Sequence, residues 1–353
     1  MNPSPPSLAK GQSVLEVRDL SAHFDTLLGP VRSVDGISLT VRAGETLGVV
    51  GESGCGKSVT AMSIMRLLPA NSAHVFGSVT LRGTELLALS ERQMRAMRGN
   101  RISMVFQEPM TSLNPVLTIG RQIAESIALH QDCSASEAHK RSVAMLRMVQ
   151  IPEPERRAKE YPHQLSGGMR QRVMIALALA CNPEVLIADE PTTALDVTIQ
   201  AQILDLIARL RADLGMGVVM ITHDLGVVAE SCDHVIVMYA GKIVEEAPVL
   251  ELFADPKHPY TRALMASMPA MNVHQDRLAE IPGLVPSAHE IRRGCTFAAR
   301  CTFANSRCRV EVPRLRPPEQ DKEPESGHLV ACFGIEEHRI PRFSSPDRAG
   351  GPK

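Results

Sequence analysis

Short apolar runs alternate with helical patterns from Val14 to about Glu246, and this alternation predicts a mostly parallel sheet covered by helices. The clearest strand candidates are residues 47–50, 185–188 and 218–221. Between the last two, apolar residues recur in steps of three and four, which predicts a helix with one buried face. These residues are Ile199, Ile203, Leu206, Ile207, Leu210 and Leu214.

The periodic pattern is interrupted once and stops well before the end of the chain. Residues from about 111 to 160 lack strand runs, so we expect a helical insertion there. Beyond residue 250 the sequence becomes rich in Pro, Arg and Cys and loses its periodicity. We therefore expect a disordered tail over 1–12, an α/β domain over 13–250, a small C-terminal domain over 251–335 and a disordered tail over 336–353.

The amino-acid composition argues against some classes of function. The chain has 353 residues, and 38 Lys and Arg against 39 Asp and Glu give a net charge of −1. Together with 8 Phe, 3 Tyr and no Trp, this argues against binding nucleic acid through bulk charge or base stacking. No apolar run approaches the roughly 20 residues that cross a bilayer. We expect a cytoplasmic protein that reaches a membrane only through a partner.

A phosphate-binding motif follows the first strand candidate. Residues 51–58 read Gly-Glu-Ser-Gly-Cys-Gly-Lys-Ser and match G-x-x-x-x-G-K-[ST] between a strand and a helix. Glycines let successive backbone N–H groups surround phosphate oxygens, Lys57 neutralises the β- and γ-phosphates, and the Ser58 hydroxyl coordinates Mg²⁺. The alternative, a Gly-rich turn with a solvated lysine, does not account for the strand and the helix. The expected nucleotide-binding residues are Gly51, Ser53, Gly54, Cys55, Gly56, Lys57, Ser58 and Val59.

The second strand candidate ends in two acids, Asp189 and Glu190. A buried strand that delivers a carboxylate at its end suits Mg²⁺ coordination by Asp189, and Glu190 can polarise the attacking water. The alternative, an N-cap at the end of the strand, is reasonable for Asp189 alone but weak for the pair after a phosphate loop. The two motifs together predict a P-loop NTPase that binds ATP and Mg²⁺.

Leu165–Met169, Leu-Ser-Gly-Gly-Met, resembles the signature motif of the ABC transporter ATPases. Ser166, Gly167 and Gly168 at the start of a helix make a second phosphate-binding terminus. The resemblance implies a RecA-like ABC cassette in which the signature of one subunit caps ATP held by the P-loop of its partner. Met169 stands where many members have Gln, which leaves the phosphate-facing residues intact.

Further motifs resemble ABC elements in the same order. Gln107 resembles the glutamine-loop residue that contacts Mg²⁺, water and the transmembrane partner, and Asp196 resembles the D-loop aspartate. His223 resembles the switch histidine near the γ-phosphate, and Phe24 is a candidate for stacking on adenine or for the core. Cys55 has two interpretations, a small residue tolerated in the loop or a thiolate favoured by a helix terminus, of which we favour the first.

The C-terminal cysteines suggest a metal. Cys295, Cys301, Cys308 and Cys332 are crowded together without the C-x₂-C spacing common in zinc sites, and wider gaps suit an iron–sulfur cube. Reduced, free cysteines in a solvated basic loop are the alternative. Seven arginines accompany them and could offset anionic thiolates or contact an acidic partner: Arg292, Arg293, Arg300, Arg307, Arg309, Arg314 and Arg316.

Residues 238–246, 258–262 and 281–283, with the cysteines, resemble the dipeptide/oligopeptide/nickel branch of ABC importers. The branch carries a C-terminal regulatory domain, and some members bind a [4Fe-4S] cluster through four such cysteines. Carried onto this chain, the ligands are Cys295, Cys301, Cys308 and Cys332, with zinc as the second choice and no metal as the third.

The resemblance implies an ATP-hydrolysing subunit of an importer of di- or oligopeptides at the cytoplasmic face of the inner membrane, with Glu190 as base and His223 as switch. Its implied partners are a related, non-identical ATPase subunit, two transmembrane permease subunits and an extracytoplasmic substrate-binding protein. The alternatives are a nickel importer, a soluble ABC-type ATPase acting on nucleic acid or the ribosome, and a small-molecule kinase. The last leaves the signature motif unexplained.

Overall fold

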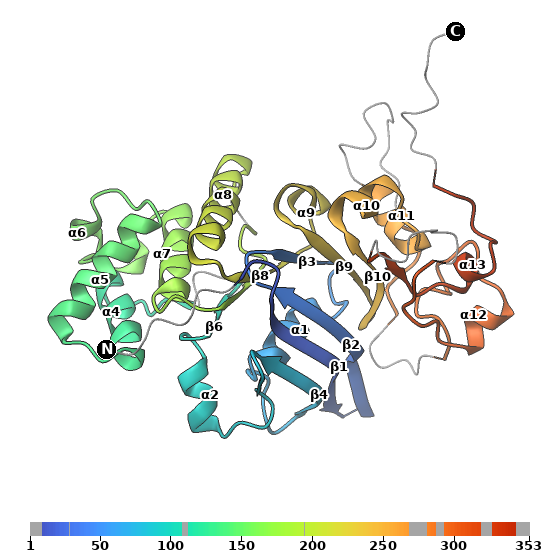
Figure 1. Cartoon of the computed structure of the whole chain (residues 1–353), viewed down its shortest axis with the longest axis horizontal. Helices are drawn as coiled ribbons and strands as arrows, with labels where there is room; N and C mark the ends of the chain where they lie inside the picture. The colour runs from blue at the N-terminus through green and yellow to red at the C-terminus, as the bar shows by residue number, and fades with distance from the viewer. Residues whose placement is uncertain are drawn as a thin grey trace, which may run out of the picture. The chain divides into compact units, whose positions relative to one another are not determined.

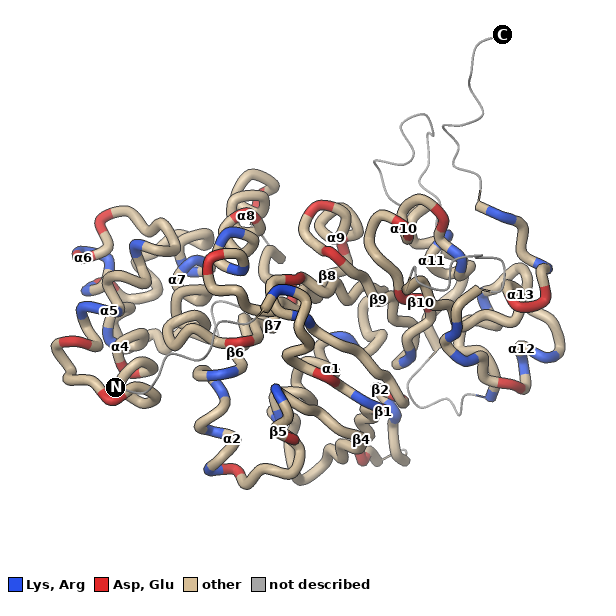
Figure 2. Tube along the Cα trace, viewed as in Figure 1, with Lys and Arg blue, Asp and Glu red and all other residues tan. Residues whose placement is uncertain are grey.

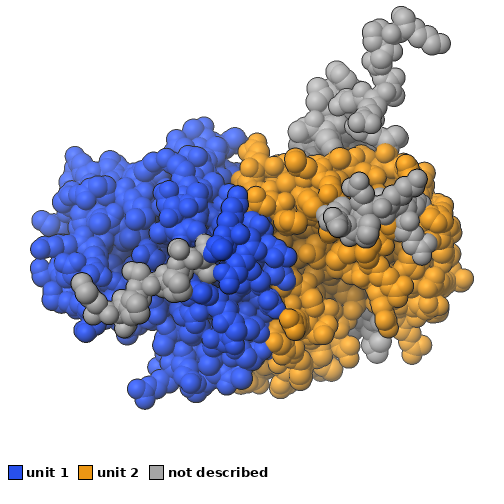
Figure 3. All heavy atoms as spheres, in the orientation of Figure 1, with its two compact units in different colours: residues 1–16, 40–46, 79–221 blue, residues 17–39, 47–78, 222–353 orange. Residues whose placement is uncertain are grey.

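The computed structural model describes residues 9–27, 29–107, 112–193, 195–267, 281–286, 293–318 and 327–343. The chain divides into two compact units (Figure 3). The first unit comprises residues 1–16, 40–46 and 79–221, and the second comprises residues 17–39, 47–78 and 222–353. Residues 1–8 and 344–353 of the expected tails lie outside the described part.

Three buried parallel strands form the centre of the first unit. They are β6 (Ile102–Val105), β7 (Val185–Asp189) and β8 (Gly217–Thr222), with β7 paired to both neighbours. Every residue of these strands is buried, which explains why they read as uninterrupted apolar runs. Two of the three strand candidates therefore form strands at the expected places.

The other elements of the first unit are mainly helices (Figure 1). The helix α4 packs on α5, and α5 packs on α7. The residues expected to form a helical insertion contain α4, α5 and α6, and residues 108–111 lie outside the described part. In order, the elements are β5 (Thr84–Glu85), α2 (Glu91–Met97), α4 (Ile119–His130), α5 (Ala135–Met148), α6 (Pro154–Arg157), the 3₁₀ helix η1 (Pro162–Gln164), α7 (Gly167–Leu179) and α8 (Val197–Leu214).

The second unit is built around another set of paired strands. Strand β3 (Thr46–Val50), the remaining strand candidate, pairs parallel with β9 (His234–Tyr239). Strand β10 (Lys242–Pro248) pairs antiparallel with β9 and, on its other side, with β11 (Leu329–Val330). Its helices are α1 (Lys57–Ile64), α9 (Leu225–Ser231), α10 (Val249–Ala254), α11 (Pro259–Ala266), α12 (Ser306–Val310) and α13 (Phe333–Glu336).

A four-stranded sheet has the order β2-β1-β4-β5. Its long strands are β1 (Ser13–Thr26), β2 (Gly29–Arg42) and β4 (Ala73–Leu81). In the second half of β2 the buried residues Ile37, Leu39 and Val41 fall on alternate positions, as expected for a strand with one face on the core.

Residues 251–335, expected as a separate small domain, belong to the same compact unit as residues 47–78. One cause is the pairing of β11 with β10, which adds a C-terminal segment to the edge of the sheet. Residues 336–343, expected within the tail, are described, and Ile340 is buried with Val330, Cys332 and Ile335. The packing of the second unit therefore extends to Ile340.

Acidic and basic residues are interspersed along the helices of both units, in keeping with the near-zero net charge (Figure 2). None of the helices in the described residues combines the length and the apolar character that crossing a bilayer requires.

Candidate nucleotide site and cysteine pocket

Residues 51–56 connect β3 to α1 in the second unit, and two of the three glycines in this loop are closely packed. Gly56 has φ +104°, and a Cβ there would lie 2.5 Å from the Ser33 carbonyl oxygen. A Cβ on Gly51, with φ +156°, would lie 2.2 Å from the carbonyl oxygen of Met238. Only glycine fits at these two positions, so the sequence motif and the loop conformation have the same cause.

The Lys57 side chain folds back over this loop. The residue is 6% exposed, and Nζ donates to the carbonyl oxygens of Gly51 at 2.7 Å and Glu52 at 3.1 Å. Ser53 and Gly54 are exposed at the top of the loop, while Ser58 and Val59 form the first turn of α1. The loop therefore presents an exposed glycine-rich turn above a buried cation.

Cys55 lies inside this loop with its side chain buried. Burial raises the pKa of the Cys55 thiol, although Lys57 Nζ, 3.8 Å from Sγ, acts in the opposite direction. A thiol with a raised pKa carries little thiolate and reacts slowly. The geometry therefore favours a small residue tolerated in the loop over a redox switch.

The end of β7 in the first unit carries the two acids. Asp189 is 3% exposed as the last residue of the strand, and Glu190 follows with φ +46°. Gln107 Nε2 donates to Glu190 Oε2 at 3.0 Å, and the Thr193 hydroxyl donates to the same oxygen at 2.8 Å. The left-handed backbone and the two donors fix one Glu190 carboxylate oxygen.

Two helix N-termini of the first unit contain the remaining ABC-like motifs. The Ser166 hydroxyl accepts from Met169 N at 3.3 Å at the start of α7, and Asp196 accepts from Ile199 N at 2.9 Å at the start of α8. A Cβ on Gly168 would lie 2.9 Å from Ile199 Cγ2, so a side chain there would press on α8. The glycine at 168 allows the two termini to approach each other.

The predicted nucleotide-site residues thus fall into two sets. Gln107, Ser166, Gly167, Gly168, Asp189, Glu190 and Asp196 belong to the first unit, and Phe24, residues 51–59 and His223 belong to the second. Within the first set, Gln107 and Glu190 are in hydrogen-bond contact. Phe24 is half-buried in β1, and His223 is exposed between β8 and α9. Ala194, next to the D-loop aspartate, lies outside the described residues.

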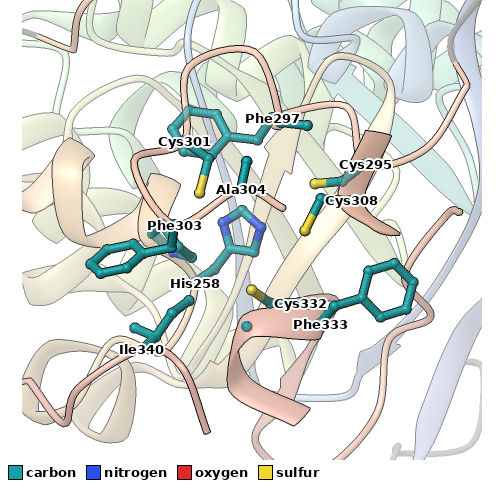
Figure 4. Close-up of a pocket in the computed structure, with 13 residues that line it drawn as sticks. His258, Cys295, Phe297, Cys301, Phe303, Ala304, Cys308, Cys332, Phe333 and Ile340 are labelled. Carbon is teal, nitrogen blue, oxygen red and sulfur yellow. The ribbon is translucent and has the colours of Figure 1, made fainter. Parts of the chain in front are cut away.

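All four clustered cysteines line one pocket of the second unit (Figure 4). The sulfur atoms of Cys295, Cys301, Cys308 and Cys332 point toward the same space. Side chains from distant parts of the sequence complete the wall, including His258, Phe297, Phe303 and Ile340. Cys308 lies on the short helix α12, and the pocket brings together residues that are far apart in the sequence.

Burial in this pocket disfavours the thiolate form of Cys295 and Cys332. Burial raises the pKa of Cys295 to about 11 and that of Cys332 to about 12. Among the described residues, no three or more His, Cys, Asp or Glu side chains are arranged to bind one metal ion. A single zinc needs ligands converging to about 2.0–2.3 Å, whereas a cube takes one thiolate on each of four irons. The four thiols of the pocket share one space without the convergence that a single ion requires.

A buried carboxylate close to this pocket was not among the sequence candidates. Glu245 is fully buried and accepts from His258 N at 3.0 Å, while Glu245 Oε1 lies 2.8 Å from His328 Nε2. Burial lowers the pKa of His258 to about 4, so this histidine is neutral. His258 and Glu245 do lie in the segments that resemble peptide importers, and that is the only signal the sequence offered.

Arg300 and Tyr260 contact the phosphate loop and were not recognised as functional. Arg300 was one of seven arginines expected to offset thiolates or meet an acidic partner, and it instead pairs with Glu52 at 2.7 Å. Tyr260 accepts a hydrogen bond from Glu52 N. No spacing rule links residues more than 200 positions apart, so only the fold reveals these contacts.

The chain matches the models of two known protein families. The family description "ABC transporter" matches residues 34–193, and "Oligopeptide/dipeptide transporter, C-terminal region" matches residues 244–308. The second match begins on β10 and includes Cys295, Cys301 and Cys308.

Several curated proteins are similar over nearly their full length. A probable peptide ABC transporter ATP-binding protein of Sinorhizobium fredii is 58% identical, with 92% of this chain and 96% of that protein covered. An oligopeptide transport ATP-binding protein of Bacillus subtilis is 48% identical, with 92% and 98% covered. Among solved structures, a dimeric ATP-binding cassette bound to ADP and phosphate is 29% identical, with a TM-score of 0.60 and 67% and 98% covered.

Proposed function

The chain belongs to the ABC transporter ATP-binding subunits, in the branch with the oligopeptide/dipeptide transporter C-terminal region, and from this premise we propose how it works. It is the ATPase subunit of a peptide importer. The observation that carries this conclusion is the 58% identity to a peptide transporter subunit over 92% of the chain. Neither nickel import nor work on nucleic acid gains support from these relatives.

ATP binds at the loop of residues 51–59. Backbone N–H groups of the exposed turn at Ser53 and Gly54 surround the phosphate oxygens, and α1 adds the positive end of its dipole. Lys57 exchanges its loop carbonyl partners for the β- and γ-phosphates. The adenine base stacks on Phe24. The Ser58 hydroxyl, the Gln107 amide and the Asp189 carboxylate supply oxygen donors of the kind Mg²⁺ prefers.

Glu190 acts as the general base. Gln107 and Thr193 both donate to Oε2 and hold the carboxylate in one orientation, from which it accepts a proton from the attacking water. Because Gln107 is also the proposed contact to the permease, movement of this residue would reorient the base. His223, exposed after β8, senses the γ-phosphate as the switch residue.

A second cassette completes the site. Ser166, Gly167 and Gly168 at the start of α7, with Asp196 at the start of α8, cap ATP held by the partner's loop. The similar solved cassette is dimeric, which supports pairing. We assign the partner as a related, non-identical ATPase subunit. Two transmembrane permease subunits then hold the pair at the cytoplasmic face of the membrane, and a substrate-binding protein delivers peptide from the other side.

The four cysteines hold a [4Fe-4S] cluster in this proposal. The support is the pocket itself, into which all four sulfurs point, and the arginine Arg339, whose Nη2 lies 3.8 Å from Cys308 Sγ. The names of the families and relatives do not mention a cluster. When bound, the group supplies structural cross-linking of the loops or one-electron chemistry. Anaerobically purified protein should absorb light at about 400 nm and contain iron and sulfide. Stoichiometric zinc without iron would overturn this assignment.

The ATP-site assignment is tested by Lys57→Ala in the full-length chain. We expect ATP binding, measured by titration with a fluorescent ATP analogue, to fall by about 100-fold or more because a charge-assisted phosphate contact is lost. Unchanged affinity would mean that ATP binds elsewhere.

A further inference from the structure

Glu52 is the second residue of the phosphate loop. Its carboxylate, its backbone N–H and its carbonyl each contact another residue of the second unit. Its carboxylate pairs with Arg300, with Oε2 2.7 Å from Nη1 and Oε1 3.2 Å from Nη2. Its backbone N–H donates to the Tyr260 hydroxyl at 2.9 Å, and its carbonyl accepts from Lys57 Nζ at 3.1 Å. Two of these three partners come from the C-terminal part of the chain.

Arg300 is itself fixed by the C-terminal part. Its side chain is only 5% exposed, Nη2 donates to the Ile281 carbonyl at 2.9 Å, and Nε donates to the Pro282 carbonyl at 2.9 Å. A guanidinium with its remaining donors occupied meets Glu52 in one bidentate geometry and loses little entropy in doing so. The position of Arg300 therefore determines where the Glu52 carboxylate lies.

Tyr260 provides a second fixed point. It is fully buried, and its ring packs against Tyr239 and Phe297 with centroid separations of 4.7 Å and 5.5 Å. The Glu52 N–H is bound to this immobile hydroxyl, so it does not serve as a phosphate donor in this arrangement. Glu52 is thus an anchor of the loop rather than part of the phosphate cradle.

Anchoring matters because a phosphate loop binds the phosphate oxygens through several backbone N–H groups, which must all point toward them. Ordering a flexible loop costs free energy that is subtracted from the binding free energy. We propose that Arg300 and Tyr260 are positioning residues, which hold the nucleotide-binding loop through Glu52 and thereby let the C-terminal cysteine-containing segment set the affinity for ATP. This inference rests on the proposed role of residues 51–59 as the ATP site.

The geometry also places the cysteine pocket next to this anchor. Arg300 directly precedes Cys301, and Phe297, which packs on Tyr260, lines the pocket together with Cys295. A rearrangement of residues 295–301, a segment that lines the pocket, would displace Arg300 and Phe297 together. The nucleotide loop would therefore respond to the packing of the pocket.

A double-mutant cycle in the full-length chain tests the anchor, using Arg300→Gln, Glu52→Gln and the two combined. We expect each single change to raise the Kd for a fluorescent ATP analogue by about five- to tenfold, within the range for charged residues in contact. The double variant should be no weaker than the weaker single one, since both changes break one contact. The KM for ATP should rise by the same factor, with kcat changed less than about twofold.

Matched variants separate positioning from loss of folding. Arg262 also donates to two backbone carbonyls of the C-terminal part, at Pro256 and Pro341, so Arg262→Gln should keep the wild-type Kd. Tyr260→Phe removes only the hydroxyl and should raise the Kd by about threefold, the loss of one neutral hydrogen bond. Arg300→Lys, which keeps the charge without the bidentate fork, should recover part of the affinity.

The proposal is overturned if Arg300→Gln leaves the Kd unchanged, if Arg262→Gln raises it equally, or if the Arg300 and Glu52 effects add. Failure of the ATP site has a different signature. If Lys57→Ala binds ATP as the wild type does, the proposed location of the site is wrong. If Lys57→Ala loses ATP while Arg300→Gln does not, only the anchor is wrong.

Discussion

The nucleotide motifs and the cysteine pocket reach their geometry in different ways. The phosphate loop is eight consecutive residues whose conformation is imposed by Gly51 and Gly56, where a Cβ would collide with backbone. The cysteine pocket is assembled from residues between His258 and Ile340, across gaps of many residues. A contiguous motif carries its geometry in its own sequence, whereas a pocket built from distant segments depends on the surrounding fold.

Electrostatics separates the two regions further. The Lys57 side chain is buried and donates to the carbonyls of Gly51 and Glu52, so a basic side chain already lies inside the loop. In the pocket, burial raises the pKa of Cys295 and Cys332, so metal binding must first remove protons. Nucleotide binding therefore exchanges the hydrogen bonds of Lys57 in the loop, whereas a metal in the pocket would displace protons from thiols.

The largest predicted effect is the loss of ATP hydrolysis in Glu190→Gln, which should change the nucleotide site and leave the cysteine pocket as it is. The amide cannot accept a proton from water, so kcat for ATP hydrolysis should fall by about 100-fold or more. The Kd for ATP should stay at the wild-type value, because glutamine matches glutamate in size and keeps an oxygen that can accept from Gln107 and Thr193. Hydrolysis is measured by phosphate release, and a loss of less than threefold would remove Glu190 as the base.

A matched pair of glycine variants tests the claim that the loop carries its own geometry. Gly56→Ala places a Cβ 2.5 Å from Ser33 O and should lower the free energy of unfolding by about 2–4 kcal/mol, with loss of ATP binding. At Gly54 no atom lies within 4 Å of such a Cβ, so only the positive φ opposes alanine. Gly54→Ala should cost about 1 kcal/mol. Denaturant unfolding measures both, and equal losses would contradict the packing argument.

The last prediction concerns how the stability of the protein depends on pH, through a histidine in the wall of the cysteine pocket. His258 has a pKa of about 4 in the folded protein, against about 6.5 when unfolded, so protons bind preferentially to the unfolded chain between these values. Stability should therefore decrease as pH falls through this window, by about 1–2 kcal/mol from pH 7 to pH 5.

The control for this pH effect is His258→Asn, which can still accept the hydrogen bond from Tyr260 N that caps α11. Its unfolding free energy should depend less steeply on pH than that of the wild type. Urea unfolding at both pH values measures the difference, and identical slopes would show that His258 does not titrate between the two states.

Much of the fold could be predicted where burial repeats along the sequence. The runs at 47–50, 185–188 and 218–221 all form strands, and the helical pattern between the last two is α8. Ile203, Leu206, Ile207 and Leu210 are buried in α8 as predicted, while Ile199 and Leu214 at its ends are half-buried. Helix ends leave the core, which a periodic pattern does not indicate.

The site was predictable to the extent that its chemistry lies in short motifs. Asp189 and Glu190 were identified from a strand that ends in acids, but the positive φ of Glu190 and its contact with Thr193 were not. The Arg300–Glu52 pair could not be inferred, because a basic stretch says nothing about which acid it meets. Its partner is decided by where the sheet places the C-terminal segment.

The most direct test of the central claim is peptide uptake by the complete transporter reconstituted in lipid vesicles, with either the wild-type chain or Glu190→Gln as the ATPase subunit. With ATP supplied on the side of this subunit, the wild type should accumulate labelled peptide, and Glu190→Gln should stay at the level seen without ATP while still binding the nucleotide. Equal accumulation by the two transporters would contradict the account, since uptake would then not depend on hydrolysis at this carboxylate.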